Sequence, residues 1–441
     1  MKRVVITGAG AVSALGHDWA SVSSALQAKK NRVRYMPEWD RFPDLQTRLA
    51  SPVDDFVLPA HYTAKKRRAM GRVAQMAVVA SENALRDAGL WNDPIISSGA
   101  TGVAYGSATG NSDAAMEFFG LLEHNSMAKI NGTTYLRMMS HTAAVNISVL
   151  FGTCGRMYTT SSACTAGSQG IGFAFEAIRA GQQTIMIAGG AEELCPTQAA
   201  VFDTVYSASL RNGRPETAPR PFDTQRDGLV LGEGACSLIL EEYEHAVRRG
   251  ANILAEVVGF ATNCDGVHLV RPNPQTMKQV MKDALASAEL NAADIGYISG
   301  HGTATLQGDL AESIATQDVM GSQIPFSALK SYIGHSLGAC GSLEAWTTIQ
   351  MMREKWFVPN LNLDELDPKP GDFQIRKKHY SSFNSTRLDA VLRELDVRAG
   401  RQHDPLDAPR ERTVARPQRQ GIGPRGMTTG RVGRGEIRAE V

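Results

Sequence analysis

Residues 158–170 of the 441-residue chain read YTTSSACTAGSQG and place Cys164 where an extended segment changes into a helix. The Thr and Ser residues before Cys164 favour an extended approach and offer hydroxyls for helix capping. The later Ile171, Phe175 and Ile178 have the apolar spacing of a helix. A cysteine in the first turn of a helix lies at the positive end of the helix dipole, which lowers the pKa of the thiol. The pattern predicts a reactive nucleophile at Cys164 or, more plainly, one further small buried residue.

Two later segments place a histidine in a similar setting. Residues 299–309, SGHGTATLQGD, follow the apolar end of a predicted strand at Tyr297-Ile298, and residues 330–339, KSYIGHSLGA, repeat the layout. A single histidine of this kind is most often a core residue with its hydrogen bonds satisfied. Because both His301 and His335 occupy glycine-flanked turns after predicted strands, a catalytic role is favoured.

The order Cys164, His301, Lys330, His335, in these settings, resembles the elongating β-ketoacyl-[acyl carrier protein] synthases of the thiolase superfamily. The resemblance runs from Met1 to about Phe383. It implies an α/β fold in which two duplicated βαβαβαββ halves form a five-layer α-β-α-β-α sandwich.

The strand pattern restarts near Ala251, which suggests two similar halves. We expect an N-terminal half at residues 1–250, with the nucleophile, and a C-terminal half at residues 251–386, with the His/Lys/His set. Residues 184–193 predict a buried strand beside the helix of the nucleophile.

The resemblance also implies the roles of the site residues. Cys164 would carry the acyl chain as a thioester, and loss of CO2 from a malonyl carrier would generate the attacking carbanion without a cofactor or a metal. His301 and His335 would then donate from Nε2 to the enolate oxygen. Lys330 would hold His301 in place.

A buried lysine needs a charge partner, and by resemblance the candidates are Asp309 and Glu312. Glu344 matches a family glutamate that supports the site through water, with a solvent-facing glutamate as the alternative. The substrate-binding residues implied are Phe202, Thr303 and Thr305.

The first strand has a second interpretation. Residues 4–13, VVITGAGAVS, predict a buried strand followed by a glycine turn, which is similar to a dinucleotide-binding fingerprint. However, the third glycine is misplaced, and KKNR at residues 29–32 stands where a strand ending in an acid is required. We therefore favour close strand–helix packing, and an NAD(P)-dependent oxidoreductase is a distant alternative.

A basic segment precedes a predicted amphipathic helix in residues 65–80, KKRRAMGRVAQMAVVA. Cations in the first turn of a helix are mildly unfavourable, although many charge runs are simply solvated. Because acyl carrier proteins are acidic, the resemblance assigns Lys65, Lys66 and Arg68 to carrier docking.

Composition restricts the function further. The formal net charge of +1 gives no general case for nucleic-acid binding, and no apolar run reaches the ~20 residues of a membrane span. The cysteines form no CxxC pair, which argues against zinc and a disulfide framework and for the cytoplasm. The partners expected are acyl carrier protein and a second copy of the chain.

The match to the family stops near the C-terminus. The family closes its site with a phrase like NSFGFGGTN, whereas residues 381–385, SSFNS, are followed here by TRLD. From residue 387 to residue 441 there are 12 arginines, no lysine, 8 acidic residues and no aromatic residue. This composition cannot form a core, and we expect a disordered or frame-shifted tail.

The resemblance predicts a 3-oxoacyl-[acyl carrier protein] synthase that elongates chains in fatty-acid or polyketide synthesis. Two alternatives are related proteins. A catalytically impaired, chain-length-factor-like subunit fits the missing gate phrase but not Cys164. A degradative thiolase needs a second catalytic cysteine, and Cys340 is poorly placed for it.

Overall fold

The structure is a computed structural model that describes residues 1–266, 271–367 and, for the backbone alone, 392–393. All of these residues belong to one compact unit. Residues 381–385, where the match to the family's closing phrase breaks off, and the expected tail, apart from those two backbone positions, lie outside the described residues.

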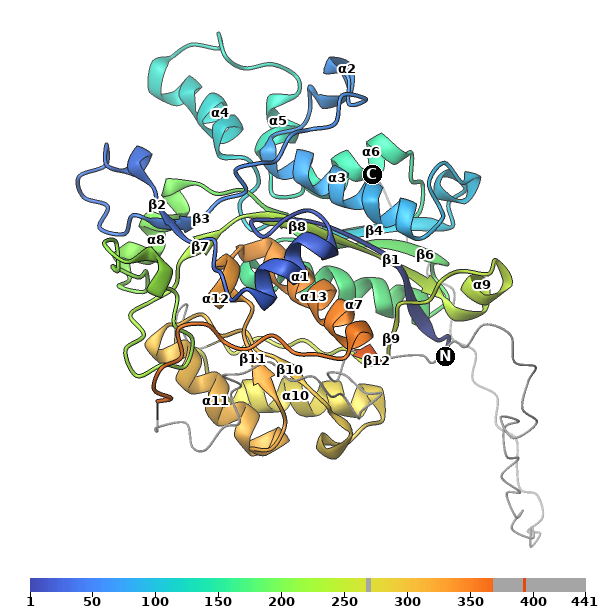
Figure 1. Ribbon diagram of the computed structural model, residues 1–441. Helices are drawn as coiled ribbons and strands as arrows, with labels where there is room; N and C mark the ends of the chain where they lie inside the picture. The colour runs from blue at the N-terminus through green and yellow to red at the C-terminus, as the bar shows by residue number, and fades with distance from the viewer. Residues whose placement is uncertain (267–270, 368–391, 394–441) are drawn as a thin grey trace, which may run out of the picture. The chain divides into compact units, whose positions relative to one another are not determined.

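A mixed sheet of seven strands forms the centre of the fold (Figure 1). Strands β4, β5 and β6 run parallel to one another, and β1, β8, β9 and β12 are added by antiparallel pairing. In spatial order the strands are β12 (Leu392–Arg393), β9 (Ala255–Val257), β1 (Val4–Ser13), β8 (Gly234–Glu242), β6 (Ile185–Glu192), β4 (Thr101–Gly106) and β5 (Met157–Thr160).

Two smaller sheets accompany it. Strands β10 (Ile298–Ser299) and β11 (Phe326–Ser327) form a parallel pair, and the third sheet has the order β2 (Arg34–Tyr35), β3 (Leu49–Ser51), β7 (Leu231–Gly232).

The helices of the described residues surround and separate these sheets. They are α1 (Trp19–Gln27), α2 (Ala64–Arg67), α3 (Arg72–Asp87), α4 (Ser112–His124), α5 (Thr134–Met138), α6 (Thr142–Phe151), α7 (Ala166–Arg179), α8 (Pro196–Thr204), α9 (Tyr243–Arg248), α10 (Pro274–Ala288), α11 (Leu306–Met320), α12 (Lys330–Ile333) and α13 (Cys340–Glu354). Short 3-10 turns are η1 (Pro37–Trp39), η2 (Pro94–Ser97), η3 (Ala163–Thr165), η4 (Pro215–Thr217), η5 (Ala292–Asp294) and η6 (Leu337–Ala339).

The large sheet is buried on both faces because side chains alternate along its strands. In β6, Ile185 and Ile187 pack in one cluster with α3 and α6. Met186 and Ala188 point the other way and pack with α7 and α13. The seven-stranded sheet therefore separates two helical layers.

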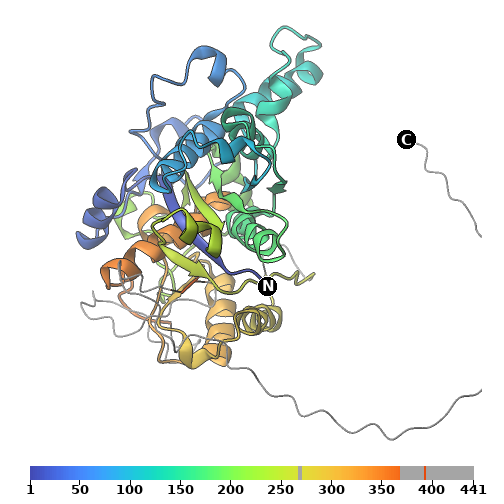
Figure 2. The ribbon, with the colours of Figure 1, turned by 90° about the vertical axis from the view of Figure 1, so that its right-hand side faces the viewer.

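The pair β10–β11 lies beyond α7 and α13. Tyr297 packs in the cluster that contains α7 and α13, whereas its neighbour Ile298 packs with α10 and α11. Figures 1 and 2 show α10 and α11, in yellow and light orange, on the far side of α7 and α13 from α3. The order of layers is α-β-α-β-α, and the predicted five-layer sandwich is confirmed.

Several predicted elements are confirmed locally. Cys164 follows strand β5 and precedes helix α7, and the predicted strand at residues 184–193 is β6. The predicted strand end at Tyr297-Ile298 is β10, which leads into the loop of His301. The strand expected after Ala251 is only the short β9, which pairs with β1 of the seven-stranded sheet.

The glycine turn predicted after the first strand is wrong, because β1 continues through both glycines to Ser13. A Cβ at Gly8 would lie 2.3 Å from the carbonyl oxygen of Ala84, and one at Gly10 would lie 2.3 Å from that of Ala80. Helix α3 thus rests on the backbone of β1. The favoured interpretation, close strand–helix packing, agrees with this geometry.

The basic segment is also placed differently from the prediction. Lys65 and Lys66 lie on the separate short helix α2, Arg68 caps it, and the amphipathic helix α3 begins only at Arg72. The cations therefore do not lie at the positive end of α3.

Among the described residues, no helix combines the length and apolar character that crossing a bilayer requires.

Candidate active site

The turn that carries Cys164 is held in an uncommon backbone conformation. Ala163 has φ of 51°, in the left-handed region that a side chain rarely adopts. Thr160, at the end of β5, closes the turn by donating from Oγ1 to the carbonyl oxygen of Ala166 at 2.7 Å. Helix α7 approaches the sheet closely, because a Cβ at Gly170 would lie 2.7 Å from the carbonyl oxygen of Ala104. The small residues after Cys164 thus allow the helix to sit against β4.

Both predicted histidines meet Cys164. His335 Nε2 lies 2.9 Å from Cys164 Sγ. The rings of His301 and His335 are nearly perpendicular, with centroids 5.2 Å apart. One side-chain ligand atom from each of the three residues lies within 4.8 Å of the others. The fold therefore brings Cys164 together with two histidines that lie more than 130 positions later in the sequence.

Hydrogen bonds at Nδ1 fix which nitrogen of each imidazole carries the proton. The backbone N–H of Leu337 donates to His335 Nδ1 at 3.2 Å, and Lys330 Nζ lies 3.2 Å from His301 Nδ1. Burial first, and then the Lys330 charge, lower the pKa of both histidines well below the usual value, so both are neutral. A neutral imidazole that accepts at Nδ1 carries its proton at Nε2. Both rings therefore present N–H donors at Nε2.

This tautomer decides what the site can hold. A cysteine and two histidines could bind a soft metal ion only through unprotonated nitrogens. With Nδ1 occupied by donors and Nε2 protonated, the histidines are suited to an oxyanion or a thiolate rather than to a cation.

The charge partner of Lys330 differs from the prediction. Lys330 is almost fully buried, and its ammonium contacts the carboxylate of Glu344, not that of Asp309 or Glu312. Glu344 thus reaches the site by direct contact with the Lys330 ammonium, and its predicted action through water stays a prediction. Burial lowers the pKa of Lys330, but Cys340 and Glu344 outweigh it, and the net pKa is raised.

Asp309 and Glu312 instead shape the loop that carries His301. Glu312 accepts from the backbone N–H of His301 at 2.6 Å and from that of Gly302 at 2.8 Å. Asp309 accepts from the N–H of Ala304 at 3.1 Å and from that of Phe222 at 2.7 Å. Both are supporting residues by geometry, although they act on the backbone and not on Lys330.

The electrostatics of Cys164 also correct the sequence argument. Burial raises the pKa of its thiol to about 11, and the Lys330 charge opposes this shift only in part. Cys164 lies in η3, before the first turn of α7, and the desolvation outweighs the helix terminus that the sequence favoured. A reactive thiol at this position would therefore need groups that stabilise the sulfur anion, and His335 Nε2 lies within hydrogen-bond distance of it.

Cys340 is a neighbour that the sequence did not connect to Cys164. It is the first residue of α13, is almost fully buried, and donates from Sγ to the carbonyl oxygen of Cys164 at 3.2 Å. Burial raises the pKa of the Cys340 thiol above its ordinary value, so it is a poor base. This argues against the second cysteine that a thiolase requires.

The three predicted substrate residues lie around the site in different roles. Phe202, on α8, packs in a cluster that includes Cys164 and Leu337. Thr305 is the N-cap of α11 and accepts from the N–H of Gly308 at 3.2 Å, and its hydroxyl also bonds that of Thr303 at 2.9 Å. Thr305 thus has a clear structural function. The predicted docking residues on α2 are all exposed.

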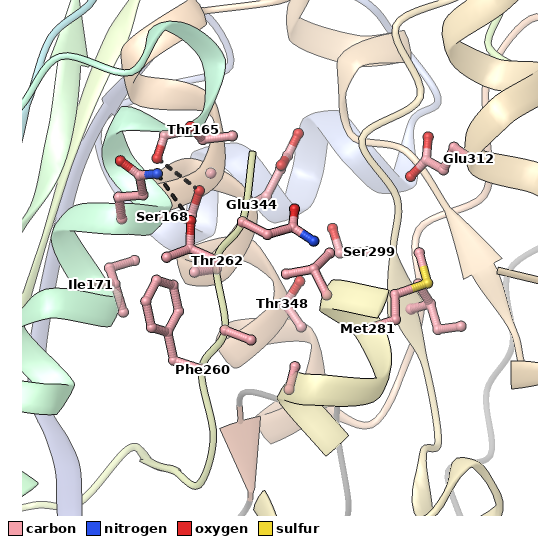
Figure 3. A pocket seen from close by; sticks show the side chains of 18 of the residues that line it. Thr165, Ser168, Ile171, Phe260, Thr262, Met281, Ser299, Glu312, Glu344 and Thr348 are labelled. Atoms are coloured by element: carbon pink, nitrogen blue, oxygen red, sulfur yellow. Dashed lines mark hydrogen bonds between the residues drawn. The ribbon is translucent and has the colours of Figure 1, made fainter. Parts of the chain in front are cut away.

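A cavity of about 450 Å³ lies beside the site and was not predicted. Figure 3 shows its lining side chains, with Glu344 and Thr348 from α13 facing Met281 from α10 and Glu312 from α11. Thr165 and Ser168, at the start of α7, also line it. Its walls come from four of the five layers, so only the folded arrangement reveals it.

Comparison with known proteins agrees with this geometry. Residues 1–246 match the family described as "Beta-ketoacyl synthase, N-terminal domain", and residues 254–364 match "Beta-ketoacyl synthase, C-terminal domain". The chain is 34% identical to 3-oxoacyl-[acyl-carrier-protein] synthase 1 of Haemophilus influenzae, over 83% of this chain and 90% of that protein.

Solved structures show the same fold. A β-ketoacyl synthase from Burkholderia phymatum is 50% identical with a TM-score of 0.86, and the match covers 90% of this chain and all of that one. A type II polyketide synthase ketosynthase, solved with its acyl-carrier protein and bound to the hexaketide, is 28% identical with a TM-score of 0.79, over 89% of this chain and all of that one. The chain therefore belongs to the β-ketoacyl synthase family and has its thiolase-type fold.

Proposed function

We propose that this chain is a 3-oxoacyl-[acyl carrier protein] synthase that uses Cys164 as its nucleophile. In the first half-reaction Sγ attacks the thioester carbonyl of an acyl carrier protein. The acyl–sulfur bond to the carrier breaks, and the thiol proton of Cys164 passes to the departing carrier thiol. The product is an acyl-Cys164 thioester, and the N–H at His335 Nε2 stabilises the sulfur while it is anionic.

The second half-reaction is a decarboxylative condensation. The bond between the malonyl carboxylate and its methylene carbon breaks, CO2 leaves, and the electron pair forms an enolate. The methylene carbon then attacks the acyl carbon and expels the Cys164 thiolate, which takes one proton from solvent to become the thiol again. The N–H groups at His301 Nε2 and His335 Nε2 would hold the enolate oxygen in a buried site, where such donors act strongly.

The observation that carries this proposal is the shared tautomer of the two histidines. Each Nδ1 faces a donor, His335 Nε2 contacts Cys164 Sγ, and one ring nitrogen of His301 lies within 4.8 Å of both residues. Two converging neutral N–H donors beside a thiol suit a developing negative charge, whereas a hydride-transfer enzyme has no use for them.

Lys330, Glu344, Glu312 and Asp309 would support the chemistry without touching the substrate. The Lys330–Glu344 pair fixes the His301 ring from Nδ1, and Glu312 fixes its backbone. Phe202, Thr303 and Thr305 remain proposed substrate contacts, supported by their position around the nucleophile and the His301 loop.

We further propose that α2 docks the acidic carrier protein through Lys65, Lys66 and Arg68. Their exposure and common sign support the proposal. A carrier-bound substrate also agrees with the name of the Haemophilus influenzae relative and with the carrier complex of the polyketide relative. We propose that this chain elongates acyl chains in fatty-acid synthesis.

We also propose a cytoplasmic homodimer. Strand β5 is the edge of the seven-stranded sheet, and an open edge readily pairs with another chain. Met157 on β5 is 48% exposed and Val149 on the adjacent α6 is 78% exposed.

The six cysteines, all free thiols, fit a reducing compartment. The division into halves at residues 1–250 and 251–386 remains part of this proposal.

A condensation assay tests the function. The full chain is incubated with decanoyl- and malonyl-loaded carrier protein, and the intact mass of the carrier protein is measured by mass spectrometry. We expect 3-oxododecanoyl carrier from the wild-type chain and none from Cys164→Ala. Conversion of decanoyl carrier to product by Cys164→Ala would contradict the assigned nucleophile, and product absent from a folded wild-type chain would contradict the function.

A further inference from the structure

Glu192 is a fully buried carboxylate near the active site that the proposed chemistry does not use. It ends strand β6 and has no exposed surface. Its Oε1 atom accepts from Ser107 Oγ at 3.1 Å, from Thr109 Oγ1 at 2.7 Å and from the Thr109 N–H at 3.2 Å. Its Oε2 atom accepts from the N–H of Ala108 at 2.6 Å and from that of Gly338 at 3.1 Å.

The contact with Gly338 reaches the catalytic histidine within one residue. Gly338 follows Leu337, whose N–H donates to His335 Nδ1. Leu337 has φ of 41°, a left-handed conformation that costs about 1 kcal/mol or more for a residue with a side chain. The turn therefore needs stabilisation from outside it. Glu192 provides this by accepting from the N–H of Gly338, the residue after Leu337.

The fit between the carboxylate and the turn is close. A Cβ at Gly338 would lie 2.8 Å from Glu192 Oε2 and 2.9 Å from the backbone nitrogen of Ala108. The side chain thus bridges the loop after β4 and turn η6, which otherwise belong to segments more than 220 residues apart.

We propose that Glu192 is a positioning residue for His335: its carboxylate holds turn η6 so that the Leu337 N–H stays on Nδ1 and the Nε2 proton faces Cys164. This inference rests on the proposed function only for its consequence in catalysis, because the geometry concerns the thiol and the imidazole alone.

A carboxylate is required at this position because every partner is a donor. Five N–H and O–H groups point at its two oxygens. Glutamine would place an NH2 group against some of these donors and leave buried N–H groups unpaired. Burial raises the pKa of Glu192 to about 6 and its hydrogen bonds oppose the shift, so the group is an ionised acceptor at pH 8.

The test is the rate at which iodoacetamide alkylates Cys164, measured from pH 6 to 10 on the full chain. Alkylation needs no substrate, so the result stands even if the chain proves inactive in condensation. Glu192→Gln should slow alkylation at pH 8 by about tenfold, the effect of losing one charge-assisted hydrogen bond to the thiolate. His335→Ala should slow it by a similar factor.

The double variant decides between positioning and other roles. If Glu192 acts through His335, then Glu192→Gln changes nothing further in the His335→Ala background. The matched control is Glu193→Gln, because Glu193 is the next buried acid but accepts from Asn111 Nδ2 and the Ser112 N–H, towards α4. It should leave the alkylation profile within about twofold of wild type, since its hydrogen bonds do not reach the His335 turn.

Two results would overturn the proposal. Faster alkylation of Glu192→Gln would mean that Glu192 acts only by its negative charge, which opposes the thiolate. Additive slowing in the double variant would mean a general structural role. If Glu192→Gln does not fold by circular dichroism, Glu192→Asp, which keeps the charge but withdraws it from Gly338, should show the same non-additive slowing.

Discussion

His335 Nε2 lies 2.9 Å from Cys164 Sγ, and its Nδ1 receives the backbone N–H of Leu337. The imidazole therefore donates to sulfur and cannot accept the thiol proton at that nitrogen while it remains in this tautomer. Since burial raises the pKa of Cys164, this donor adds a direct contact to the Lys330 charge in stabilising the thiolate. Removal of His335 should therefore impair both half-reactions.

His335→Ala should lower the acylation rate of Cys164 by about 10²–10³, the usual cost of one oxyanion-type donor. The rate is measured in a single turnover with decanoyl carrier. His335→Gln is the matched variant, because its side-chain amide nitrogen reaches about as far as Nε2 and should recover part of the rate. Equal rates for wild type and His335→Ala would show that the contact is incidental.

The Lys330–Glu344 pair gives a prediction about stability. Lys330→Met removes one partner of a buried ion pair and should lower the free energy of unfolding by about 3 kcal/mol, because Glu344 is left without its cation. Urea unfolding measures the change.

The double variant Lys330→Met/Glu344→Leu should recover most of that loss while activity stays absent, since His301 would still lack its donor at Nδ1. Two independent and additive losses would refute a direct interaction between these side chains.

Asp309 predicts a pH dependence of stability. Burial raises its pKa from 3.8 to about 7, so the folded chain holds this proton more tightly than the unfolded chain. The Asp309 carboxyl therefore leaves the free energy of unfolding unchanged below pH 4. It lowers this free energy progressively between pH 4 and 7, and the loss is complete above pH 7. The full amount is on the order of 4 kcal/mol.

Asp309→Asn removes this titration. The difference in unfolding free energy between variant and wild type, followed by urea unfolding from pH 4 to 8, should move in favour of the variant as the pH rises. A difference that is flat over this range would mean that Asp309 keeps an ordinary pKa.

The close packing of β1 on α3 is testable at one glycine. Gly8→Ala should lower the free energy of unfolding by about 2 kcal/mol, because its Cβ would overlap the backbone of Ala84 and Ala88. Gly213→Ala is the control, since a Cβ there meets nothing within 4 Å, and its effect should stay within about 0.5 kcal/mol. A Gly8→Ala variant as stable as wild type would contradict this packing.

The proposed docking surface predicts a change in carrier affinity. Lys65→Glu/Lys66→Glu should raise KM for the acyl carrier protein about tenfold at low salt and leave kcat within twofold, because charge steering acts on association. The control is Lys29→Glu/Lys30→Glu, an equal charge reversal at another exposed place. Equal effects of both pairs would assign the change to net charge and not to α2.

Much of this site could be predicted from the sequence because its chemistry is local. Cys164 follows strand β5 and His301 follows strand β10, and the glycines near both are visible in the sequence, whereas His335 follows the short helix α12. The alternation of Ile185, Met186 and Ile187 in β6 likewise follows from an apolar run buried on both faces.

The remaining features depend on distances between segments. The pairing of Lys330 with Glu344 is decided by which carboxylate points at Nζ, and sequence spacing does not show this, since Asp309, Glu312 and Glu344 all lie within 21 residues of Lys330. The raised pKa of Cys164 depends on burial by other layers, which a helix-start pattern does not contain. Gly8 and Gly10 matched a turn because glycine marks both turns and close packing.

The proposed function depends on the formation of an acyl-enzyme at Cys164. The most direct measurement is the intact mass of the full chain after incubation with decanoyl carrier protein, with Cys164→Ala and Cys340→Ala alongside. We predict one added decanoyl group on the wild-type chain and on Cys340→Ala, and none on Cys164→Ala. No adduct on a folded wild-type chain, or an adduct that persists in Cys164→Ala, would contradict the account.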